Sequence, residues 1–193
     1  VHSGEILAMA SNPDYDPNAW VGGISVAEYN QIKENNSLFN KAISGSYAPG
    51  SIFKMVTALA GLESGVISTT EKINDTGIYT RYRDYQPRCW YYNSYHRGHG
   101  YLDVSGAIEK SCNYFFYETG NRMGIETLDK YANYFGLGRK TGIELPSETS
   151  GTLASPEAAK KANETWSSGQ TLQAAIGQSY NSFSPIQLVK YIG

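Results

Sequence analysis

The 193-residue sequence is poor in features that would assign it to several classes of protein. Its two cysteines are too few for the disulfide framework of a small secreted domain. It has no block of lysine and arginine, and its formal net charge of −2 gives no reason to expect nucleic acid as a partner. It has no secretory signal and no apolar run long enough to cross a bilayer. What is present, with 40% hydrophobic residues, is the composition of one globular domain with a sizeable core.

Both ends of the sequence lie inside patterns. It begins at VHSGEILAMAS without an initiator methionine, and it stops at YIG within another pattern. We therefore expect residues 1–193 to be a piece of a longer protein, namely the N-terminal and central part of one domain. The absence of a signal or anchor from this piece therefore says little about the longer protein.

Periodicity and turn residues predict a chain that is mostly helical with little strand. Residues 4–11, GEILAMAS, alternate and predict one strand. The helix expected after Pro49-Gly50 is apolar nearly all round and should be buried. Residues 66–102 predict a long loop with one short hairpin, and loops of that length are usually functional. Further helices are expected around 26–33, from 103 onward, over 125–135, and after the Ser-Pro pairs at 155–156 and 184–185.

A serine and a lysine stand at the start of the helix expected after residue 50. Ser51 and Lys54 are one turn apart and share a polar stripe with Thr57. Burial lowers the pKa of a lysine, because it disfavours the charged form, and the neutral amine can act as a base. Serine is a weak nucleophile until such a base takes its proton, and free N–H groups at a helix start favour an oxyanion. This pattern indicates a serine nucleophile, Ser51, with Lys54 as its base.

The same two residues also have an ordinary explanation. A serine often caps a helix start, and a lysine one turn later can extend its ammonium to solvent. With ordinary residue usage, a bare Ser-x-x-Lys occurs by chance roughly once in a couple of hundred residues. Ser51 and Lys54 alone leave both interpretations open.

A second polar triplet, Ser111-Cys112-Asn113, lies where one helical stretch gives way to another. A serine hydroxyl can relay a proton between a lysine and a leaving group, and an asparagine amide can hold a substrate carbonyl. Serine and asparagine are also common at helix breaks because they cap them. The triplet alone therefore carries little weight.

Taken together, the two motifs and their surroundings resemble the transpeptidase domain of class B penicillin-binding proteins. The Ser-x-x-Lys of YAPGSIFK and the Ser-x-Asn of SCN are motifs of penicillin-binding proteins and serine β-lactamases. The likeness covers nearly the whole chain and is greatest to elongation-type and sporulation-type enzymes. The segments that carry it are GEILAMASNPDYDPN, YAPGSIFKMVTALAGLESG, GHGYLDVSGAIEKSCNYFFYETG, YFGLGRKTGIELPSETSG and AIGQSYNSFSPIQLVKYI.

This resemblance implies acyl transfer on peptidoglycan stem peptides, with no cofactor required for catalysis. Ser51 would attack the penultimate D-alanine and expel the terminal D-alanine, and an amine of a neighbouring stem would then resolve the acyl-enzyme. Lys54 would be the base, Ser111 the proton shuttle to the departing amine, and Asn113 the group that orients the substrate amide. The backbone N–H of Ser51 would be one oxyanion donor. β-Lactams would acylate the same serine.

The implied fold is α+β, the penicillin-binding protein and serine β-lactamase fold, in which a five-stranded antiparallel sheet packs against helices. This chain would hold the helical half and part of the sheet. The family's third motif, Lys-Thr-Gly, lies on a strand beside the active site. Lys140-Thr141-Gly142 spells it, but within FGLGRKTGIELP, where the family has a turn. We interpret it as a decoy, expect the working motif beyond residue 193, and expect the fragment alone to be inactive.

The resemblance also raises the prospect of a zinc site, which the bare spacing indicates only weakly. Some elongation-type members hold zinc beside the Ser-x-Asn motif. By position the ligands here would be Asp75, His99 and Cys112, with Cys89 as the fourth. A Cys89–Cys112 disulfide and two free buried thiols are the alternatives, and an extracytoplasmic location would permit the disulfide.

Other functions share part of this pattern. A serine β-lactamase has the first two motifs but needs a general base for deacylation, and no Glu-x-x-Leu-Asn segment is present. A β-lactam sensor domain and a non-catalytic scaffold are further alternatives. As a class B enzyme, the full-length protein would be anchored on the extracytoplasmic face of the bacterial membrane. Its ligands would be stem peptides and β-lactams, and its partner a membrane glycosyltransferase.

Overall fold

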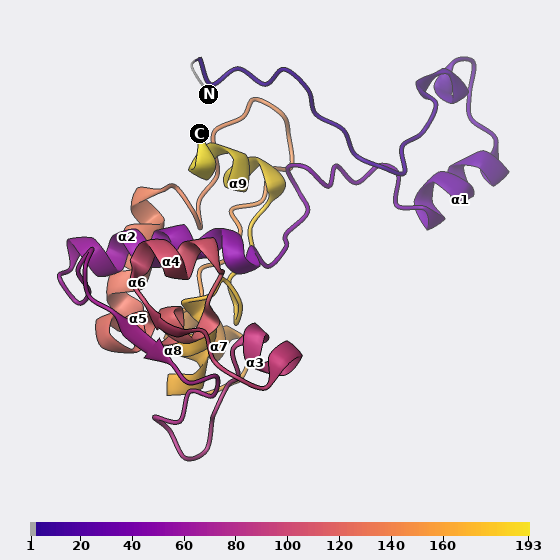
Figure 1. Ribbon diagram of the computed structural model, residues 1–193. Helices are drawn as coiled ribbons and strands as arrows, with labels where there is room; N and C mark the ends of the chain where they lie inside the picture. The colour runs from indigo at the N-terminus through magenta and orange to yellow at the C-terminus, as the bar shows by residue number, and fades with distance from the viewer. Residues whose placement is uncertain (1–2) are drawn as a thin grey trace.

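Helix α5 (Asn113–Met123) is the centre of a helical body in the computed structural model of the chain, which describes residues 3–193 (Figure 1). It packs against both α2 (Lys54–Glu63) and α8 (Ser168–Ala174), and α2 also packs against α6 (Ile125–Tyr134). The remaining helices of the described chain are η1 (Pro17–Trp20), α1 (Val26–Glu34), η2 (Gly50–Phe53), α3 (Trp90–Tyr95), α4 (Val104–Glu109), α7 (Pro156–Lys161) and α9 (Pro185–Ile192).

Two apolar clusters hold the helical body together. Phe115 and Phe116 of α5 are buried in the first cluster, with residues of α4 and of the strands. Phe53 and Phe183 stack at 6.1 Å between ring centroids in the second cluster, which also takes in buried residues of α6. Each buried phenylalanine contributes about 1.5–3 kcal/mol relative to an exposed one. The ends of η2, α2, α5 and α8 are therefore fixed relative to one another.

The one sheet in residues 3–193 has two short antiparallel strands, β1 (Ile73–Asp75) and β2 (Gly100–Leu102). Ile73 pairs with Leu102, and Asp75 pairs with Gly100. The sequence predicts one short hairpin within residues 66–102; the antiparallel pair is present, but its two strands are far apart in sequence and helix α3 was not predicted. The connection between the strands contains α3, so it is a long loop with a helix in it and not a tight turn.

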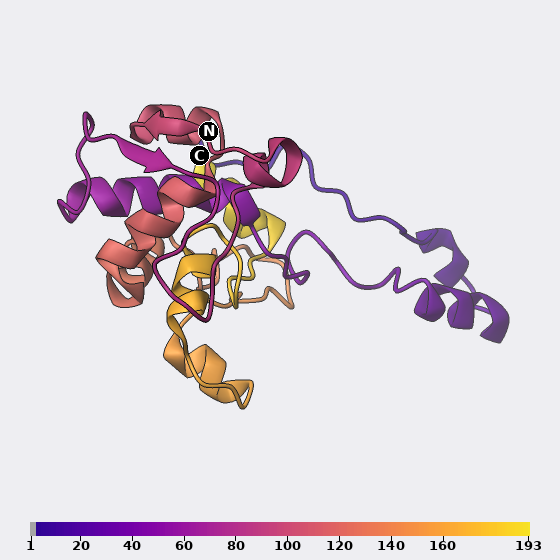
Figure 2. The ribbon, with the colours of Figure 1, turned by 60° about the horizontal axis from the view of Figure 1, so that its bottom comes forward.

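The strand predicted over residues 4–11 is wrong. This segment is extended chain with no neighbouring strand in the described structure, and Leu7 is 94% exposed. Alternation alone cannot make a strand, because the backbone N–H and C=O groups need a partner to form a ladder. The following segment, which carries η1 and α1, extends away from the helical body in both views (Figures 1 and 2).

The helix predicted after Pro49-Gly50 differs from the expectation in two respects. Residues Gly50–Phe53 form a 3-10 turn, and the α-helix begins only at Lys54. It is also not buried all round, since Ile52, Met55 and Leu59 are 44%, 39% and 43% exposed. These three residues share one face, which is left partly exposed.

The serine-proline pairs start helices as predicted. Ser155 caps α7, and Ser184 caps α9 through a reciprocal pair of contacts with Gln187. Within residues 3–193 we find no helix that combines the length and the apolar character needed to span a membrane.

Candidate active site

The side chain of Lys54 is buried, with only 3% of the residue exposed. Its ammonium donates hydrogen bonds to the backbone oxygen of Ser111 at 2.8 Å, to Ser111 Oγ at 2.9 Å and to Asn113 Oδ1 at 2.6 Å. These acceptors satisfy all three donors of the ammonium inside the protein. The alternative in which Lys54 extends to solvent is therefore wrong.

Burial lowers the pKa of Lys54 to about 8, and the nearby thiols of Cys112 and Cys89 act in the opposite direction. At pH 7 about one lysine in ten is then unprotonated, compared with about three in ten thousand for an ordinary lysine. An amine that is partly neutral and already hydrogen-bonded to a hydroxyl is suited to act as a general base.

Ser51 reaches Lys54 through Ser111. The hydroxyl of Ser111 donates a hydrogen bond to Ser51 Oγ at 2.9 Å, and no hydrogen bond joins Ser51 directly to Lys54 in the described part of the chain. Ser51 lies in the 3-10 turn η2, and Lys54 begins α2. The expected serine-lysine pair is therefore a relay of three groups.

The break between α4 and α5 places the second motif. Ser111 has a left-handed φ of +48°, and Asn113 is the first residue of α5. A residue other than glycine is uncommon in this region of backbone space and is held there by its surroundings. Here both the hydroxyl and the backbone oxygen of Ser111 contact the ammonium of Lys54. The helix break therefore places Ser111 against Lys54.

A pocket of about 380 Å³ opens at Ser51. Ser111 and Asn113 lie on its wall, whereas Lys54 does not. No sequence signal points to Trp90, which follows Cys89 and precedes two tyrosines, or to Ile176, which resembles an ordinary core residue. The full lining is Gly50, Ser51, Trp90, Ser111, Asn113, Ile176 and Gln178.

Gly177 fixes the backbone next to Ser51. The N–H of Gly50 donates to the oxygen of Gly177 at 2.9 Å. Gly177 has a φ of +74°, and a Cβ there would lie 2.2 Å from the oxygen of Gly50. Only glycine fits such a close approach. The AIGQS segment therefore holds η2 in place.

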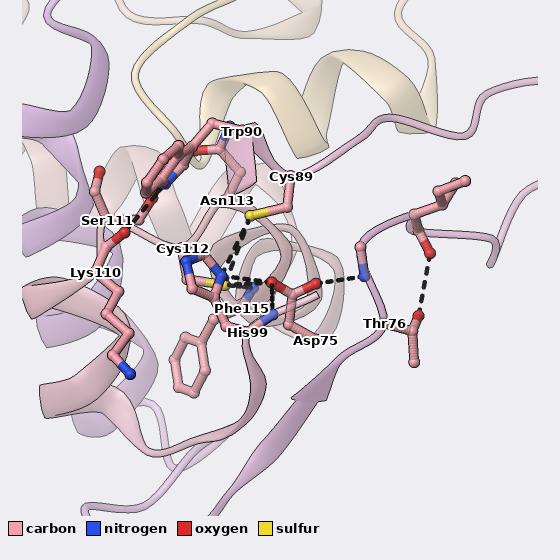
Figure 3. Close-up of polar contacts among 12 residues, drawn as sticks. Asp75, Thr76, Cys89, Trp90, His99, Lys110, Ser111, Cys112, Asn113 and Phe115 are labelled. Atoms are coloured by element: carbon pink, nitrogen blue, oxygen red, sulfur yellow. Dashed lines mark hydrogen bonds and ion pairs between the residues drawn. The ribbon is translucent and has the colours of Figure 1, made fainter. Parts of the chain in front are cut away.

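The four residues that family position suggested as metal ligands come together beside this pocket. Asp75, Cys89, His99 and Cys112 point toward one another in Figure 3, and one ligand atom of each lies within 4.8 Å of all the others. His99 Nδ1 is 2.7 Å from Asp75 Oδ2, and Cys112 Sγ is 3.3 Å from the same oxygen. The two sulfurs are 4.0 Å apart and are not bonded to each other.

The two thiols of the cluster differ in pKa. A hydrogen bond from Cys112 lowers the pKa of the Cys89 thiol to about 6, whereas the same contact and burial raise the pKa of Cys112. Burial acts to raise the pKa of Asp75, but hydrogen bonds from His99 and Gly77 outweigh it and hold that pKa below its usual value. Two sulfurs, an imidazole and a carboxylate form a donor set that zinc prefers, so the residues fit this ion.

Lys140-Thr141-Gly142 lies in irregular chain that precedes the turn at residues 146–147. Thr141 donates from its backbone and hydroxyl to Glu148, and Gly142 donates to the same carboxylate. None of the three residues belongs to a strand or to the wall of the pocket at Ser51. These contacts agree with the interpretation of this motif as a decoy.

Comparison with known proteins is consistent with this geometry. Residues 1–193 match the family described as "Penicillin binding protein transpeptidase domain". The peptidoglycan D,D-transpeptidase MrdA of Acinetobacter baumannii is 36% identical over 195 residues, which are 96% of this chain and 28% of that protein. The Escherichia coli K12 protein of the same name is 36% identical over 97% of this chain and 30% of its own length. Stage V sporulation protein D of Bacillus subtilis is 36% identical over 78% of this chain and 21% of its own. The chain thus spans less than a third of the length of these relatives.

Solved structures of the same kind confirm the expected α+β fold. Pseudomonas aeruginosa PBP2 in complex with WCK 5153 matches with a TM-score of 0.88 and 35% identity, covering 98% of this chain and 43% of that chain. PBP2 of Helicobacter pylori in complex with MreC matches with a TM-score of 0.88 and 33% identity, covering 96% of this chain and 34% of that chain. On these matches, the chain belongs to the penicillin-binding protein transpeptidase domain family.

Proposed function

We propose that this chain carries the acylating part of the active site of a peptidoglycan D,D-transpeptidase. The observation that carries the proposal is the relay from Ser51 through Ser111 to the buried amine of Lys54, with 2.9 Å between successive groups. The names of the relatives support peptidoglycan stem peptides as the substrate class.

In the first step Ser51 Oγ attacks the carbonyl carbon of the penultimate D-alanine. Its proton passes to Ser111, whose own proton passes to the neutral amine of Lys54. Ser51 lies in the first turn of η2, so its backbone N–H has no partner inside the turn and can donate to the oxyanion. The C–N bond then breaks, and Lys54 returns the proton through Ser111 to the departing terminal D-alanine. Asn113, on the wall of the pocket, holds the substrate amide.

In the second step an amine of a neighbouring stem attacks the acyl carbon. The new C–N bond forms as the bond to Ser51 breaks. The relay of Lys54 and Ser111 takes the proton that the amine loses and delivers it to Ser51 Oγ. A β-lactam places a reactive carbonyl at the same position and leaves a long-lived acyl-enzyme, because no amine displaces it. A serine β-lactamase differs only in hydrolysing this intermediate rapidly with an added general base.

We also propose that the cluster of Asp75, Cys89, His99 and Cys112 holds a structural zinc ion. The donor types, the burial and the thiolate character of Cys89 support this proposal. Four protein ligands would leave no open coordination position, so the ion would supply cross-links between chain segments. Catalysis itself requires no cofactor here.

Two similar structures support a proposal for the partners and the location of the full-length protein. One similar structure is a complex of PBP2 with MreC, and another describes coordination of polymerization and crosslinking by a peptidoglycan synthase complex. We infer that the full-length protein acts at the extracytoplasmic face of the cell membrane, anchored outside this fragment and beside a membrane glycosyltransferase. Its ligands would be stem peptides and β-lactams.

The proposal is tested with the full-length protein, a pentapeptide stem ending in D-Ala-D-Ala, and a stem that offers an acceptor amine. We expect D-alanine to be released and a cross-linked peptide to form. Ser51→Ala should abolish both products, whereas Ser46→Ala, which removes an exposed serine outside the pocket, should keep both. D-Alanine release by Ser51→Ala, or release without cross-linking at every acceptor concentration, would show that the proposal is wrong.

A further inference from the structure

Trp90 lies on the wall of the pocket, and the steps above give it no task. Its indole Nε1 donates to the backbone oxygens of Lys110 and Ser111, both at 3.1 Å (Figure 3). Trp90 is 42% exposed and lines the pocket. Its indole N–H is directed at the break between α4 and α5.

The backbone oxygen of Ser111 is held by two donors. One is Trp90, and the other is the ammonium of Lys54 at 2.8 Å. This peptide group belongs to a residue with a left-handed φ of +48°, a conformation that costs of the order of 1 kcal/mol or more for serine. The two donors are the visible contacts that compensate for this cost at the carbonyl.

Trp90 is itself held by residues outside the catalytic relay. It directly follows Cys89, which is fully buried in the four-residue cluster. Its ring meets the rings of Tyr91 and His99 edge to face, with centroids 5.6 and 5.7 Å away. The indole N–H therefore has a fixed direction before any substrate binds.

We propose that Trp90 is a positioning residue for Ser111. Its indole N–H keeps the Ser111 peptide in the left-handed conformation that directs Ser111 Oγ to both Ser51 and Lys54. This inference rests on the proposed function, because it assigns Trp90 a role through the proton relay. Loss of the N–H lets the peptide relax to a right-handed conformation, which withdraws the hydroxyl from Ser51 and slows acylation without weakening the encounter with the ligand.

The test compares two tryptophans that each donate from the indole. Trp166 Nε1 donates to Thr171 Oγ1 at 3.0 Å and is not on the pocket wall, so it is the matched control. In the full-length protein each tryptophan is replaced singly by phenylalanine. In a second pair of variants each is replaced by 3-benzothienylalanine, which has sulfur in place of the N–H. The acylation rate constant and the non-covalent dissociation constant for penicillin are measured separately, together with the thermal midpoint.

For both replacements of Trp90 we expect the acylation rate constant to fall about tenfold, because the hydrogen bonds that orient Ser111 are lost. The dissociation constant should change by less than about twofold, and both replacements of Trp166 should acylate at the wild-type rate. Wild-type acylation by the benzothienyl variant at Trp90 would overturn the proposal, because the N–H would then have no role.

A loss of non-covalent affinity with an unchanged rate constant would also overturn it, because Trp90 would then be a ligand contact. An equal loss at Trp166 would overturn it as well, because the effect would be one of stability. If the wild-type protein does not react with penicillin, the proposed function fails first and this inference fails with it. If penicillin reacts normally in all variants, only the role of Trp90 is wrong.

Discussion

Lys54 shows how one buried cation can be tolerated in a helix of apolar residues. Its three hydrogen bonds go to Ser111 and Asn113, which are some sixty positions away in sequence. A buried ammonium without such partners would cost several kcal/mol. The contacts that make burial of the Lys54 ammonium possible are therefore also the contacts of the proposed relay.

The rate of acylation by penicillin should rise with pH and level off above a midpoint near 8. The neutral amine of Lys54 is the reactive form, and burial lowers its pKa from 10.5 to about 8, so the active fraction grows as pH passes upward through that value. The measurement is the second-order rate constant of acylation between pH 6 and 10, in the range where the protein stays folded.

Lys54→Arg provides the control for this profile. Arginine keeps its positive charge at every pH in the range, so the rate should fall by about two to four orders of magnitude and lose its rise near pH 8. A wild-type rate that is independent of pH would contradict the role of Lys54 as the base.

Gly177→Ala should destabilise the protein by about 2–4 kcal/mol and slow acylation, since its Cβ would meet the oxygen of Gly50 at 2.2 Å. Gly65→Ala is the matched control. Gly65 has nearly the same φ, +73°, but a Cβ there meets nothing within 4 Å, so only the backbone cost of about 1 kcal/mol remains. Chemical denaturation measures both values, and equal losses would show that the contact with Gly50 has no importance.

At the scale of helices and strands, local signals predicted most starts and missed what depends on distant partners. Ser155 and Ser184 mark helix starts because a cap acts within one turn. The strand over residues 4–11 failed because alternation says nothing about a neighbouring strand. The exposed face of α2 was missed because an apolar stripe does not reveal whether anything covers it.

The candidate site follows the same rule. Ser51, Lys54, Ser111 and Asn113 were predicted from residue types and family likeness, and the structure brings them together. The relay through Ser111 was not predictable, because it depends on a left-handed residue between α4 and α5. Trp90 was missed because its hydrogen bonds go to backbone oxygens twenty residues away.

Packing between α5 and α8 can be tested with one methyl group. A Cβ at Gly120 would lie 2.4 Å from the Cβ of Ala175, so Gly120→Ala should destabilise the protein by about 1–3 kcal/mol. Gly106→Ala in α4 adds the same methyl group with nothing closer than 3.4 Å, and should be neutral or stabilising by up to about 1 kcal/mol. If urea denaturation gives Gly120→Ala the wild-type midpoint, α5 and α8 do not pack as described.

In the whole molecule, the four-residue cluster connects segments that are far apart in sequence. Asp75 ends β1, His99 precedes β2, Cys89 precedes α3, and Cys112 precedes α5. Cys89 and Cys112 also directly adjoin Trp90 and Ser111. The conformation of the loop between the two strands therefore affects the geometry of the pocket.

We predict that full-length protein purified without added metal contains about one zinc per chain. His99→Ala should lose the zinc and lower the thermal midpoint by at least about 5 °C, because the ion cross-links the loop to the helical body. His96→Ala, which changes an exposed histidine three residues away, should change neither. Metal analysis and thermal denaturation check this. Absence of zinc, with a mass two hydrogens short, would indicate a Cys89–Cys112 disulfide instead.

The central claim is that Ser51 is the nucleophile and that its acyl-enzyme persists until an amine resolves it. Mass spectrometry of the full-length protein after brief exposure to penicillin tests this most directly. We predict a mass increase of one penicillin, located on the peptide that contains Ser51, which lasts long after free penicillin is removed. Absence of an adduct, an adduct on another residue, or an adduct that hydrolyses within seconds would contradict the account.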